Sequence, residues 1–481
     1  MPHNAMAPGS VIDGFVIGEK IHTGGMATLW RVTRADIDQP IVMKVPTILE
    51  GDDPTVIVGF EMEMMILPRL VGKHVPKFYA MGDFASQPYL VMEYIQGYSL
   101  FTLIEKAPMP AANVARIGAK VARALVDLHR QNVLHLDIKP SNIMIRDNGS
   151  AALIDFGLSR HLFLPDLLEE EFRVPMGTGP YIAPEQVMKN RSEPRSDIYS
   201  LGVLLYYLAT NVRPFGLPQA QSQLKKRLWR DPVPPRKIIP DLPPWLQEAI
   251  LRCLEVDPAD RYETAARLAF DLSHTDQIKL TARAQKTKRD SLPVSWKRWF
   301  KSIGEDGGPI QPVRQSNLAP IIMAAVDFTE GQEALAEELL VNVRRVLATM
   351  PGVRIACVNV LKLNRLTITY TLDDEGRSVH VQRLVELRDW ARPLELGQER
   401  ITFHVLEHMD PAEALIEFAS SNHVDQVLIG ARASSSFRRF LGSVSSQVVA
   451  RAACTVTVVR APRALADVEA EEEKMIDKDC A

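Results

Sequence analysis

Two short runs of the sequence carry side chains suited to moving a phosphoryl group. One run contains Asp137 and Asn142, and the other, Asp155-Phe156-Gly157, begins thirteen residues after Asn142. Phosphoryl transfer requires held nucleotide phosphates, metal ions bound by carboxylate and amide oxygens, and a carboxylate near the attacking hydroxyl. Asp137 has a carboxylate for orienting a hydroxyl, whereas Asn142 and Asp155 have the hard oxygen atoms that Mg²⁺ prefers.

Upstream of these runs stand a glycine pair and a lysine inside an apolar stretch. Gly24 and Gly25 lie between two predicted strands, where glycine lets the backbone approach phosphate oxygens. Lys44 lies in the predicted strand 41–45. Each feature taken alone also has an ordinary structural explanation, because glycine turns are common and a strand lysine is often an edge side chain.

In order and spacing, these motifs resemble the protein kinase family over about residues 12–272. The sequence Lys-Pro-x-Asn at residues 139–142 is the serine/threonine form of the family's catalytic loop. The resemblance implies transfer of the ATP γ-phosphoryl group to serine and threonine hydroxyls of a protein substrate, with two Mg²⁺ ions bound by Asn142 and Asp155. It implies a catalytic set of Asp137, Lys139, Lys44 and Glu63, with Glu61 as the rival partner of Lys44.

The resemblance also implies where ATP and the substrate bind. Thr178, near the end of the activation segment, is expected to contact Asp137 and Lys139. The hinge between the lobes is expected to bind adenine through backbone groups of residues 93–95. The whole expected ATP site consists of Ile21, His22, Thr23, Gly24, Gly25, Met26, Ala27, Leu29, Lys44, Glu93 and Ile95.

The chain departs from the family pattern in its glycine loop and in its catalytic loop. His22 and Ala27 replace glycines, which keeps a pseudokinase scaffold open as an alternative. Leu136 stands where most members have the arginine that clamps a phosphorylated activation loop. Between residues 157 and 183 the hydroxyl side chains are those of Ser159, Thr178 and Tyr181. We therefore expect activity not to depend on phosphorylation of this loop.

Other residues of this region are expected to have structural roles. Glu185 is expected to form a buried ion pair with Arg261, and Asp197 to brace the catalytic loop. Asp166 and the acidic run 169–171 form either a solvated loop or a surface that favours basic substrate peptides.

A small β-rich part followed by a larger helical part is expected to position these side chains. The apolar pattern predicts strands at residues 15–20, 28–34, 41–45, 77–83 and 89–93, with one helix between the third and the fourth. From about residue 110 to residue 272 the pattern is mainly helical. The predicted fold class is the α+β bilobal protein-kinase fold.

The C-terminal part has a different pattern. Strands and helices alternate from residue 321 to residue 460, which predicts an α/β doubly wound parallel sheet. Residues 319–461 resemble a universal stress protein domain, which implies a second nucleotide site formed by Asp327, Gly430, Gly442, Ser443 and Ser445. Ala433 takes the place of a glycine found in ATP-binding members, so a structural or dimerising domain is the alternative.

The length of 481 residues is enough for two to four domains. We predict a flexible leader (1–11), a kinase domain (12–272), a basic linker (273–316), a stress-protein-like domain (317–462) and an acidic disordered tail (463–481). The linker holds nine Lys and Arg against four Asp and Glu, whereas the tail holds seven acidic and three basic residues, which indicates that neither builds a core.

The net charge, the cysteines and the length of the apolar runs restrict which partners and which cellular compartment we expect. The net charge of −3 does not indicate nucleic-acid binding. The four cysteines are far apart, as in cytoplasmic proteins with reduced thiols, and no apolar run approaches the roughly 18 residues of a membrane helix.

The expected partners are ATP, a protein substrate and a second copy of the chain, bound through the C-terminal domain. An adenine-nucleotide-responsive regulatory protein is a further alternative. Residues 296–301 either touch an anionic membrane or dock onto a domain, and we favour docking. Candidate autophosphorylation sites in the basic segment are Thr281, Thr287, Ser291 and Ser295.

Overall fold

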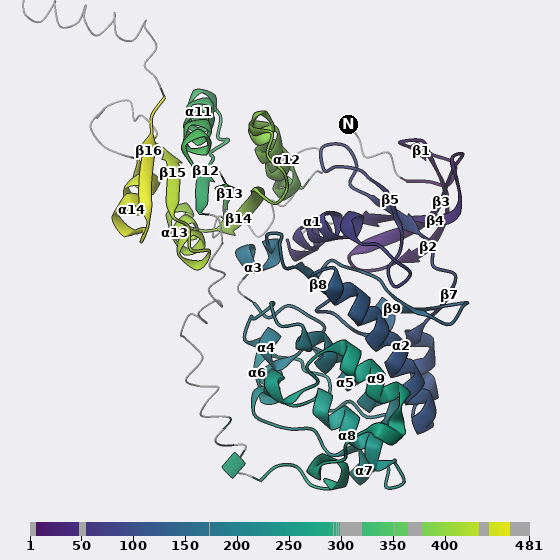
Figure 1. Cartoon of the computed structure of the whole chain (residues 1–481). Helices are drawn as coiled ribbons and strands as arrows, with labels where there is room; N and C mark the ends of the chain where they lie inside the picture. The colour runs from purple at the N-terminus through teal and green to yellow at the C-terminus, as the bar shows by residue number, and fades with distance from the viewer. Residues whose placement is uncertain are drawn as a thin grey trace, which may run out of the picture. The chain divides into compact units, whose positions relative to one another are not determined.

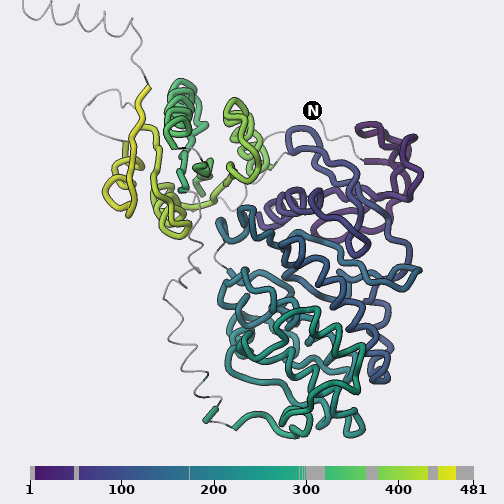
Figure 2. Tube along the Cα trace, viewed as in Figure 1, coloured from purple at the N-terminus to yellow at the C-terminus, as the bar shows by residue number. Residues whose placement is uncertain are grey.

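The computed structural model describes residues 6–47, 54–172, 174–291, 293–294, 296, 298, 320–350, 352–363, 378–431 and 442–461. These residues form two compact units, one before residue 316 and one after it (Figures 1 and 2). Each unit has its own hydrophobic core. Among the helices described, none is both long and apolar enough to cross a bilayer.

A six-stranded antiparallel sheet with the order β1-β2-β3-β4-β6-β5 opens the first unit. One face of the sheet is apolar and buried, and it includes Phe15, Trp30 and Met43 on the strands and Tyr89 just before β6. The elements are β1 (Val11–Ile12), β2 (Phe15–Thr23), β3 (Ala27–Arg34), β4 (Ile37–Pro46), β5 (Phe78–Met81), β6 (Leu90–Glu93) and one helix, α1 (Thr55–Ile66).

Helices make up most of the rest of the first unit. The amphipathic helix α2 packs its apolar stripe against α5 and α9. α5 passes close to α8 because Gly202 has no side chain there: an added Cβ atom would lie 2.4 Å from the Cβ atom of Cys253. The helices are α2 (Ala111–Arg130), α3 (Leu167–Glu171), α4 (Pro184–Val187), α5 (Arg195–Thr210), α6 (Gln221–Lys225), α7 (Pro235–Ile238), α8 (Pro244–Cys253) and α9 (Ala265–Ser273).

Short strands hold the loops of this helical part. β8 (Val133–Leu134) pairs with β11 (Arg160–His161), and β9 (Ile143–Arg146) lies between β7 (Gly97–Ser99) and β10 (Ala151–Leu153). Residues 135–142 therefore connect β8 to β9, and residues 154–159 connect β10 to β11. Both runs singled out for chemistry are loops with strands at either end, and the predicted α+β bilobal fold is confirmed.

The second unit is a five-stranded parallel sheet with the order β14-β13-β12-β15-β16. Met323 and Ala325 belong to the core on the side of α13 and α14, whereas Ile322 and Ala324 are buried on the opposite face, so the sheet is covered on both sides. The elements are β12 (Ile321–Ala325), α11 (Glu333–Thr349), β13 (Arg354–Lys362), α12 (Val379–Ala391), β14 (Ile401–His408), α13 (Pro411–Ser421), β15 (Gln426–Gly430), α14 (Ser443–Arg451) and β16 (Thr455–Val459). The predicted doubly wound parallel sheet is confirmed (Figure 1).

The chain does not leave the first unit where α9 ends at Ser273. Short 3₁₀ turns follow at Thr275–Gln277 and Ala282–Gln285, and the second turn packs against α8. The segment for which the sequence predicted a linker is therefore bound to the first unit over its first part.

Candidate active site

Asp197, at the start of α5, fixes the backbone of the catalytic loop. Its Oδ2 accepts a hydrogen bond from the His135 amide at 2.9 Å, and its Oδ1 accepts one from the Leu136 amide at 2.8 Å. Leu136 has a positive φ of 59°, a strained conformation for a branched residue that these bonds help to maintain. Burial acts to raise the pKa of Asp197, but the contacts with His129 and His135 together outweigh it, so this pKa is lowered.

Asp137 lies at the centre of a network that joins the catalytic loop to the activation segment. Its Oδ1 accepts hydrogen bonds from the Thr178 hydroxyl at 2.6 Å and the Thr178 amide at 3.0 Å. Its Oδ2 lies 2.7 Å from the Lys139 amine and 3.0 Å from the Asn142 Nδ2. Lys139 also donates to the Thr178 hydroxyl at 3.0 Å. The structure thus brings together the residues expected to act on the substrate hydroxyl.

A second cluster forms around Lys44 on β4. The Lys44 amine lies 2.5 Å from Glu63 Oε2 and 2.9 Å from Asp155 Oδ1. Of the two rival glutamates on α1, both are buried, and Glu63 is the one that reaches Lys44. The contact between Lys44 and Glu63 matters because a buried charge without a partner is strongly unfavourable.

Burial and the neighbouring charges shift the pKa of all three members of the cluster. Burial opposes the charge of Lys44, but Asp155 and Glu63 outweigh it and raise the pKa of the amine. Lys44 lowers the pKa of Asp155 to about 2, although burial acts in the opposite direction. Burial raises the pKa of Glu63 although Lys44 opposes this change. Asp155 is therefore ionised throughout the physiological range.

Close backbone packing connects α1 to the Asp155 loop. Gly59 on α1 lies against Gly157, where an added Cβ atom on Gly59 would meet the Gly157 carbonyl oxygen at 3.2 Å. The Phe156 amide lies 3.4 Å from Glu63 Oε1, and the Phe156 ring is buried 5.4 Å from the His135 ring. α1 can therefore present Glu63 to Lys44 only while this loop keeps its conformation.

The glycine turn lies between β2 and β3, as expected. The Gly24 amide donates to the Ala27 carbonyl at 2.9 Å, which closes the turn. An added Cβ atom at Gly25 would meet no heavy atom within 4 Å among the described residues, and Met26 is exposed. His22 lies beside the turn, with its Nε2 3.5 Å from the position of a Gly24 Cβ atom. The other expected residues here, Ile21, Thr23 and Leu29, lie on β2 and β3 on either side of the turn.

The expected hinge follows β6. The carboxylate of Glu93 is engaged by the Arg146 guanidinium, so this side chain is a structural contact. Ile95 is buried, and within the described residues its backbone amide and carbonyl have no hydrogen-bond partner. Unpaired buried backbone groups are rare, and those of Ile95 are suited to pairing with a planar base.

A buried ion pair that sequence analysis missed joins the activation segment to the chain after α4. Arg191 Nε lies 2.7 Å from Asp166 Oδ2, and both side chains are at most 4% exposed. Arg191 also donates to the Leu158 carbonyl at 3.0 Å, and Asp166 caps α3 by accepting from the Glu169 amide at 3.3 Å. The acidic run at 166–171 is therefore not simply a solvated loop, since Asp166 is inside the protein. The sequence showed Asp166 only as one acidic residue near an acidic run, which gave no sign that it is buried.

Two further contacts hold the same segment. Arg261 makes a two-bonded ion pair with Glu185, each bond being 2.7 Å long. Ser159 is fully buried and donates its hydroxyl to the His135 carbonyl at 3.1 Å. The only hydroxyl early in the segment is therefore turned inward.

The donor set for a metal ion is small but chemically suitable. Asn142 turns its Nδ2 atom toward Asp137, and its Oδ1, which accepts the Ser141 hydroxyl at 3.2 Å, is the atom able to bind a cation. Together with the Asp155 carboxylate it supplies the oxygen ligands that Mg²⁺ uses alongside substrate phosphates. In the described part of the chain, no group of three or more His, Cys, Asp and Glu side chains forms a separate metal site.

The second unit has a cavity of about 690 Å³ beyond the carboxyl ends of β12 and β15. In an open parallel sheet, ligands bind where neighbouring strands lead to opposite sides, as these two do. The expected residues all line this cavity: Asp327, Gly430, Gly442, Ser443 and Ser445. Ala433 lies outside the described residues.

Individual residues of this cavity also have structural tasks. Asp327 Oδ1 accepts from the Thr329 hydroxyl at 2.5 Å, and Gly430 leaves room for Leu335, which an added Cβ atom would meet at 2.6 Å. Sequence analysis missed Asn359, a buried polar residue in the middle of β13 that lines the cavity. The isolated amide within an apolar strand was the available signal.

Comparison with known families agrees with this geometry. Residues 15–271 match the protein kinase domain family, and residues 320–460 match the universal stress protein family. The first match covers more than half of the 481 residues. The chain therefore belongs to the protein kinase family and carries a universal stress protein domain.

Similar proteins include bacterial serine/threonine-protein kinases. PknL of Mycobacterium tuberculosis is 35% identical over 259 residues, which cover 54% of this chain and 64% of PknL. PknB of Mycolicibacterium smegmatis is 29% identical over 297 residues, which cover 60% of this chain and 48% of PknB. The solved kinase domain of M. tuberculosis PknI covers 56% of this chain and 99% of its own length, with 22% identity and a TM-score of 0.45. The chain thus spans about two thirds of PknL and half of PknB.

Proposed function

We propose that this protein is a serine/threonine protein kinase that transfers the γ-phosphoryl group of ATP to hydroxyls of a protein substrate. The observation that carries the proposal is the assembled site, in which Asp137 contacts Lys139, Asn142 and Thr178 while Lys44 contacts Glu63 and Asp155. A scaffold protein without catalytic activity would not require both of these clusters to be assembled.

Each group then has a task in the transfer. Asp137 orients the substrate hydroxyl and receives its proton, and Lys139 lies beside it to bind the transferring phosphoryl group. Lys44, held by Glu63, binds the other phosphates of ATP. Asn142 and Asp155 are the residues that would hold Mg²⁺, which supplies neutralising charge at the phosphates. The glycine turn and the Ile95 backbone position the nucleotide.

We also propose that activity does not require phosphorylation of the activation segment. Leu136 provides no cation for a phosphate, and the Asp166–Arg191 pair supports the segment without one. The buried Ser159 cannot be modified while the segment has this conformation. A phosphorylated residue between 158 and 176 whose removal abolishes turnover, found by mass spectrometry of the active protein, would contradict this proposal.

The direct test compares Asp137→Asn with the wild-type chain in a radiolabelled ATP assay on a general basic protein. We expect phosphate incorporation to fall by about 100-fold or more, because the carboxylate that orients the hydroxyl is lost. Asp241→Asn, at an exposed position, is the matched control and should keep wild-type activity. Equal labelling by Asp137→Asn and the wild type would leave the pseudokinase scaffold as the better account.

A second function is favoured by the cavity of the C-terminal unit. We propose that it binds an adenine nucleotide with Asp327 near the base and the start of α14, at Gly442 and Ser443, near the phosphates. The helix N-terminus and the backbone amides there favour an anion. The C-terminal domain would then report nucleotide levels to the kinase.

Self-association through the C-terminal domain is a further proposal. The edge strand β16 ends the parallel sheet with partly buried Val456 and Val458, and an edge strand is a ready template for pairing with a second copy. Light scattering of the full chain over a range of concentrations should give a dimer mass, whereas a monomer mass at every concentration would contradict it.

A further inference from the structure

A segment that follows the kinase helices is clamped onto α8 by buried polar side chains. We call residues 281–290 the strap. Gln247 and Glu248, on the face of α8 toward the strap, are 0% and 2% exposed. Buried polar side chains of this kind are stable only when they are hydrogen-bonded, and here the partners come from the strap.

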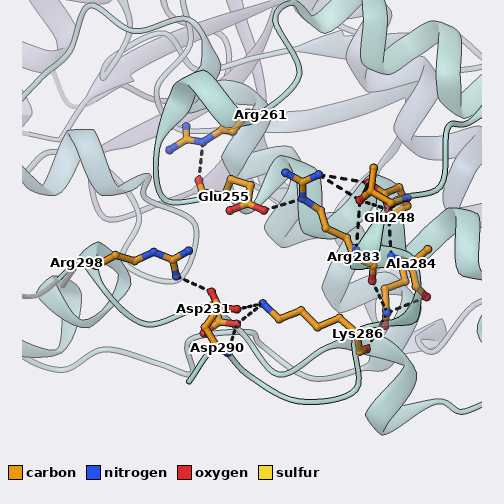
Figure 3. Close-up of polar contacts among 11 residues, drawn as sticks. Asp231, Glu248, Glu255, Arg261, Arg283, Ala284, Lys286, Asp290 and Arg298 are labelled. Carbon is orange, nitrogen blue, oxygen red and sulfur yellow. Dashed lines mark hydrogen bonds and ion pairs between the residues drawn. The ribbon is translucent and has the colours of Figure 1, made fainter. Parts of the chain in front are cut away.

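Glu248 holds the start of the strap. Its carboxylate accepts the Thr281 amide and the Thr281 hydroxyl, each at 2.9 Å, and the Ala284 amide at 3.1 Å. Figure 3 shows the Arg283 guanidinium between Glu248 and Glu255, with Nε 2.7 Å from the Glu255 carboxylate. Thr281 therefore contributes two of the donors that keep Glu248 satisfied.

Gln247 holds the backbone of the same turn. Its Nε2 donates to the carbonyls of Arg283 at 2.8 Å and Lys286 at 2.9 Å, and its Oε1 accepts the Arg236 amide at 2.8 Å. Both polar residues of α8 are thus fully committed to the strap or to the chain beside it. The docking is specific rather than a loose surface contact.

A second cluster fixes the end of the strap. The Lys286 amine lies 2.8 Å from Asp231 and 2.6 Å from Asp290, and Arg298 lies 2.8 Å from Asp290 (Figure 3). These ion pairs are half-buried. They should therefore hold the far end more weakly than Glu248 and Gln247 hold the start.

We propose that Thr281 is a phosphorylation site of this kinase and that a phosphate on its Oγ1 releases the strap from α8. This inference rests on the proposed function. In the reaction, an Oγ1–P bond forms while the bond between the γ-phosphorus and the β–γ bridging oxygen of ATP breaks. ADP leaves with the electron pair, and the hydroxyl proton passes to Asp137 and then to solvent.

Thr281 is suited to accept a phosphate. The residue is exposed although its hydroxyl bonds Glu248, so only a local opening is needed to present it. Lys279 and Arg283 flank it, so the site is a basic peptide. The ordinary role of Thr281 is to cap the turn 282–285 through the Arg283 amide at 3.3 Å, and the unmodified residue keeps that role.

Charge decides what the phosphate does. Glu248 and Glu255 face the single guanidinium of Arg283, so this group already has a net charge of −1. A phosphate adds about −1.5 to −2 at pH 7 and removes the hydroxyl donor that Glu248 used. Arg283 cannot compensate three anionic groups, and the phosphate would repel the Glu248 carboxylate most strongly, because that carboxylate is buried and little water screens its charge. The strap must leave to restore solvation.

Release lengthens the connection between the two units. Bound, the strap keeps the chain on the kinase unit as far as Asp290, whose amide donates to Asp231, whereas the released residues 281–290 can span up to about 35 Å. A phosphate at Thr281 would thus change how far the C-terminal domain can move from the kinase domain.

The test uses the full chain incubated with Mg²⁺ and ATP. Tandem mass spectrometry should find phosphate on Thr281, and hydrogen exchange at the Thr281 and Ala284 amides should become at least about tenfold faster in the phosphorylated fraction, because bonds to a charged acceptor are lost. Thr281→Glu should speed exchange of the same amides without ATP. Thr287→Glu is the matched control: it adds the same charge at an exposed strap residue that has no described hydrogen-bond partner, and it should leave exchange unchanged.

Each outcome separates this inference from the proposed function. If a general basic protein is labelled while Thr281 stays unmodified, the kinase assignment stands and the inference fails. If neither the basic protein nor Thr281 is labelled, the proposed function is refuted, and the inference that rests on it is refuted as well. If Thr281 is modified, or replaced by Glu, and exchange in the strap matches that of Thr287→Glu, release is refuted.

Discussion

At the scale of single residues, the site depends on side chains that connect two segments. Thr178 is the clearest case, because its hydroxyl donates to Asp137 and accepts from Lys139. A carboxylate that must meet a substrate hydroxyl in a set orientation benefits from such a fixed neighbour. The activation segment thus contributes a residue to the site itself.

Replacing Thr178 by Val should therefore impair catalysis more than folding. We expect kcat to fall by about 10- to 100-fold, the effect of losing hydrogen bonds to charged groups. Thr178→Ser keeps the hydroxyl and should retain most of the activity. Steady-state kinetics together with thermal unfolding distinguish the two effects, and equal kcat values for the Val and Ser variants would contradict the role of the hydroxyl.

Asp197 offers a pH-dependent test. Its pKa in the folded chain is lowered below its usual value, so its contribution to stability is present above the unfolded pKa of about 3.9 and is lost as the pH falls further. At pH 7, Asp197→Asn should reduce the free energy of unfolding by about 1–3 kcal/mol, because one backbone donor loses its acceptor. Urea titrations at pH 7, 5, 4 and 3 should show this difference shrinking below pH 4; a constant difference would exclude the ionised carboxylate as its source.

At the scale of elements, α1 and the activation segment must both be in place before the site is complete. α1 presents Glu63 to Lys44 and packs Gly59 on Gly157. The activation segment is held by buried pairs, Asp166 with Arg191 and Glu185 with Arg261. These contacts hold the activation segment without any phosphate.

The Asp166–Arg191 pair can be tested by a double-mutant cycle. Arg191→Met should cost about 3–5 kcal/mol of unfolding free energy, since it leaves the buried Asp166 without its partner. Asp166→Leu combined with Arg191→Met should recover much of that stability, because two apolar side chains replace two charges. Chemical denaturation measures the energies. Additive losses in the double variant would show that the two side chains do not interact.

At the scale of the whole molecule, two units with separate cores share one chain. Each unit has a site suited to a nucleotide, one around Lys44 and one in the cavity beside Asp327. Any ligand that binds only the folded state of a unit stabilises that unit. Nucleotide binding can therefore be followed unit by unit.

Calorimetry of the full chain should show two unfolding transitions, and ATP with Mg²⁺ should raise the temperature of both. At 100 times the dissociation constant the stabilisation is about 2.7 kcal/mol for each site. Lys44→Met should abolish the shift of one transition and leave the other, whereas Lys189→Met, at an exposed position outside both proposed nucleotide sites, should preserve both shifts. A single ATP-sensitive transition in the wild type would contradict a second nucleotide site.

The amino-acid sequence was enough to predict the fold and to propose which side chains act in the chemistry. Residues 135–142 and 155–157 have types and spacing that few other sites require, and the alternation of the C-terminal strands and helices indicated a parallel sheet. The acid, base and oxygen ligands are properties of residue types. They can therefore be inferred without knowing where the chain turns.

Which of these residues come into contact depends on how the chain folds in three dimensions. Glu61 and Glu63 lie about 200° apart around a helix, so at most one reaches Lys44, and the way α1 rests on the sheet selects Glu63. Asp166 and Arg191 come together across 25 residues, and Lys44 and Asp155 across 111. The sequence pattern of the strap predicts a polar linker, because the strap has no apolar stripe of its own. It is held instead by two buried polar residues of α8. Such contacts arise from long-range packing, which local sequence patterns do not encode.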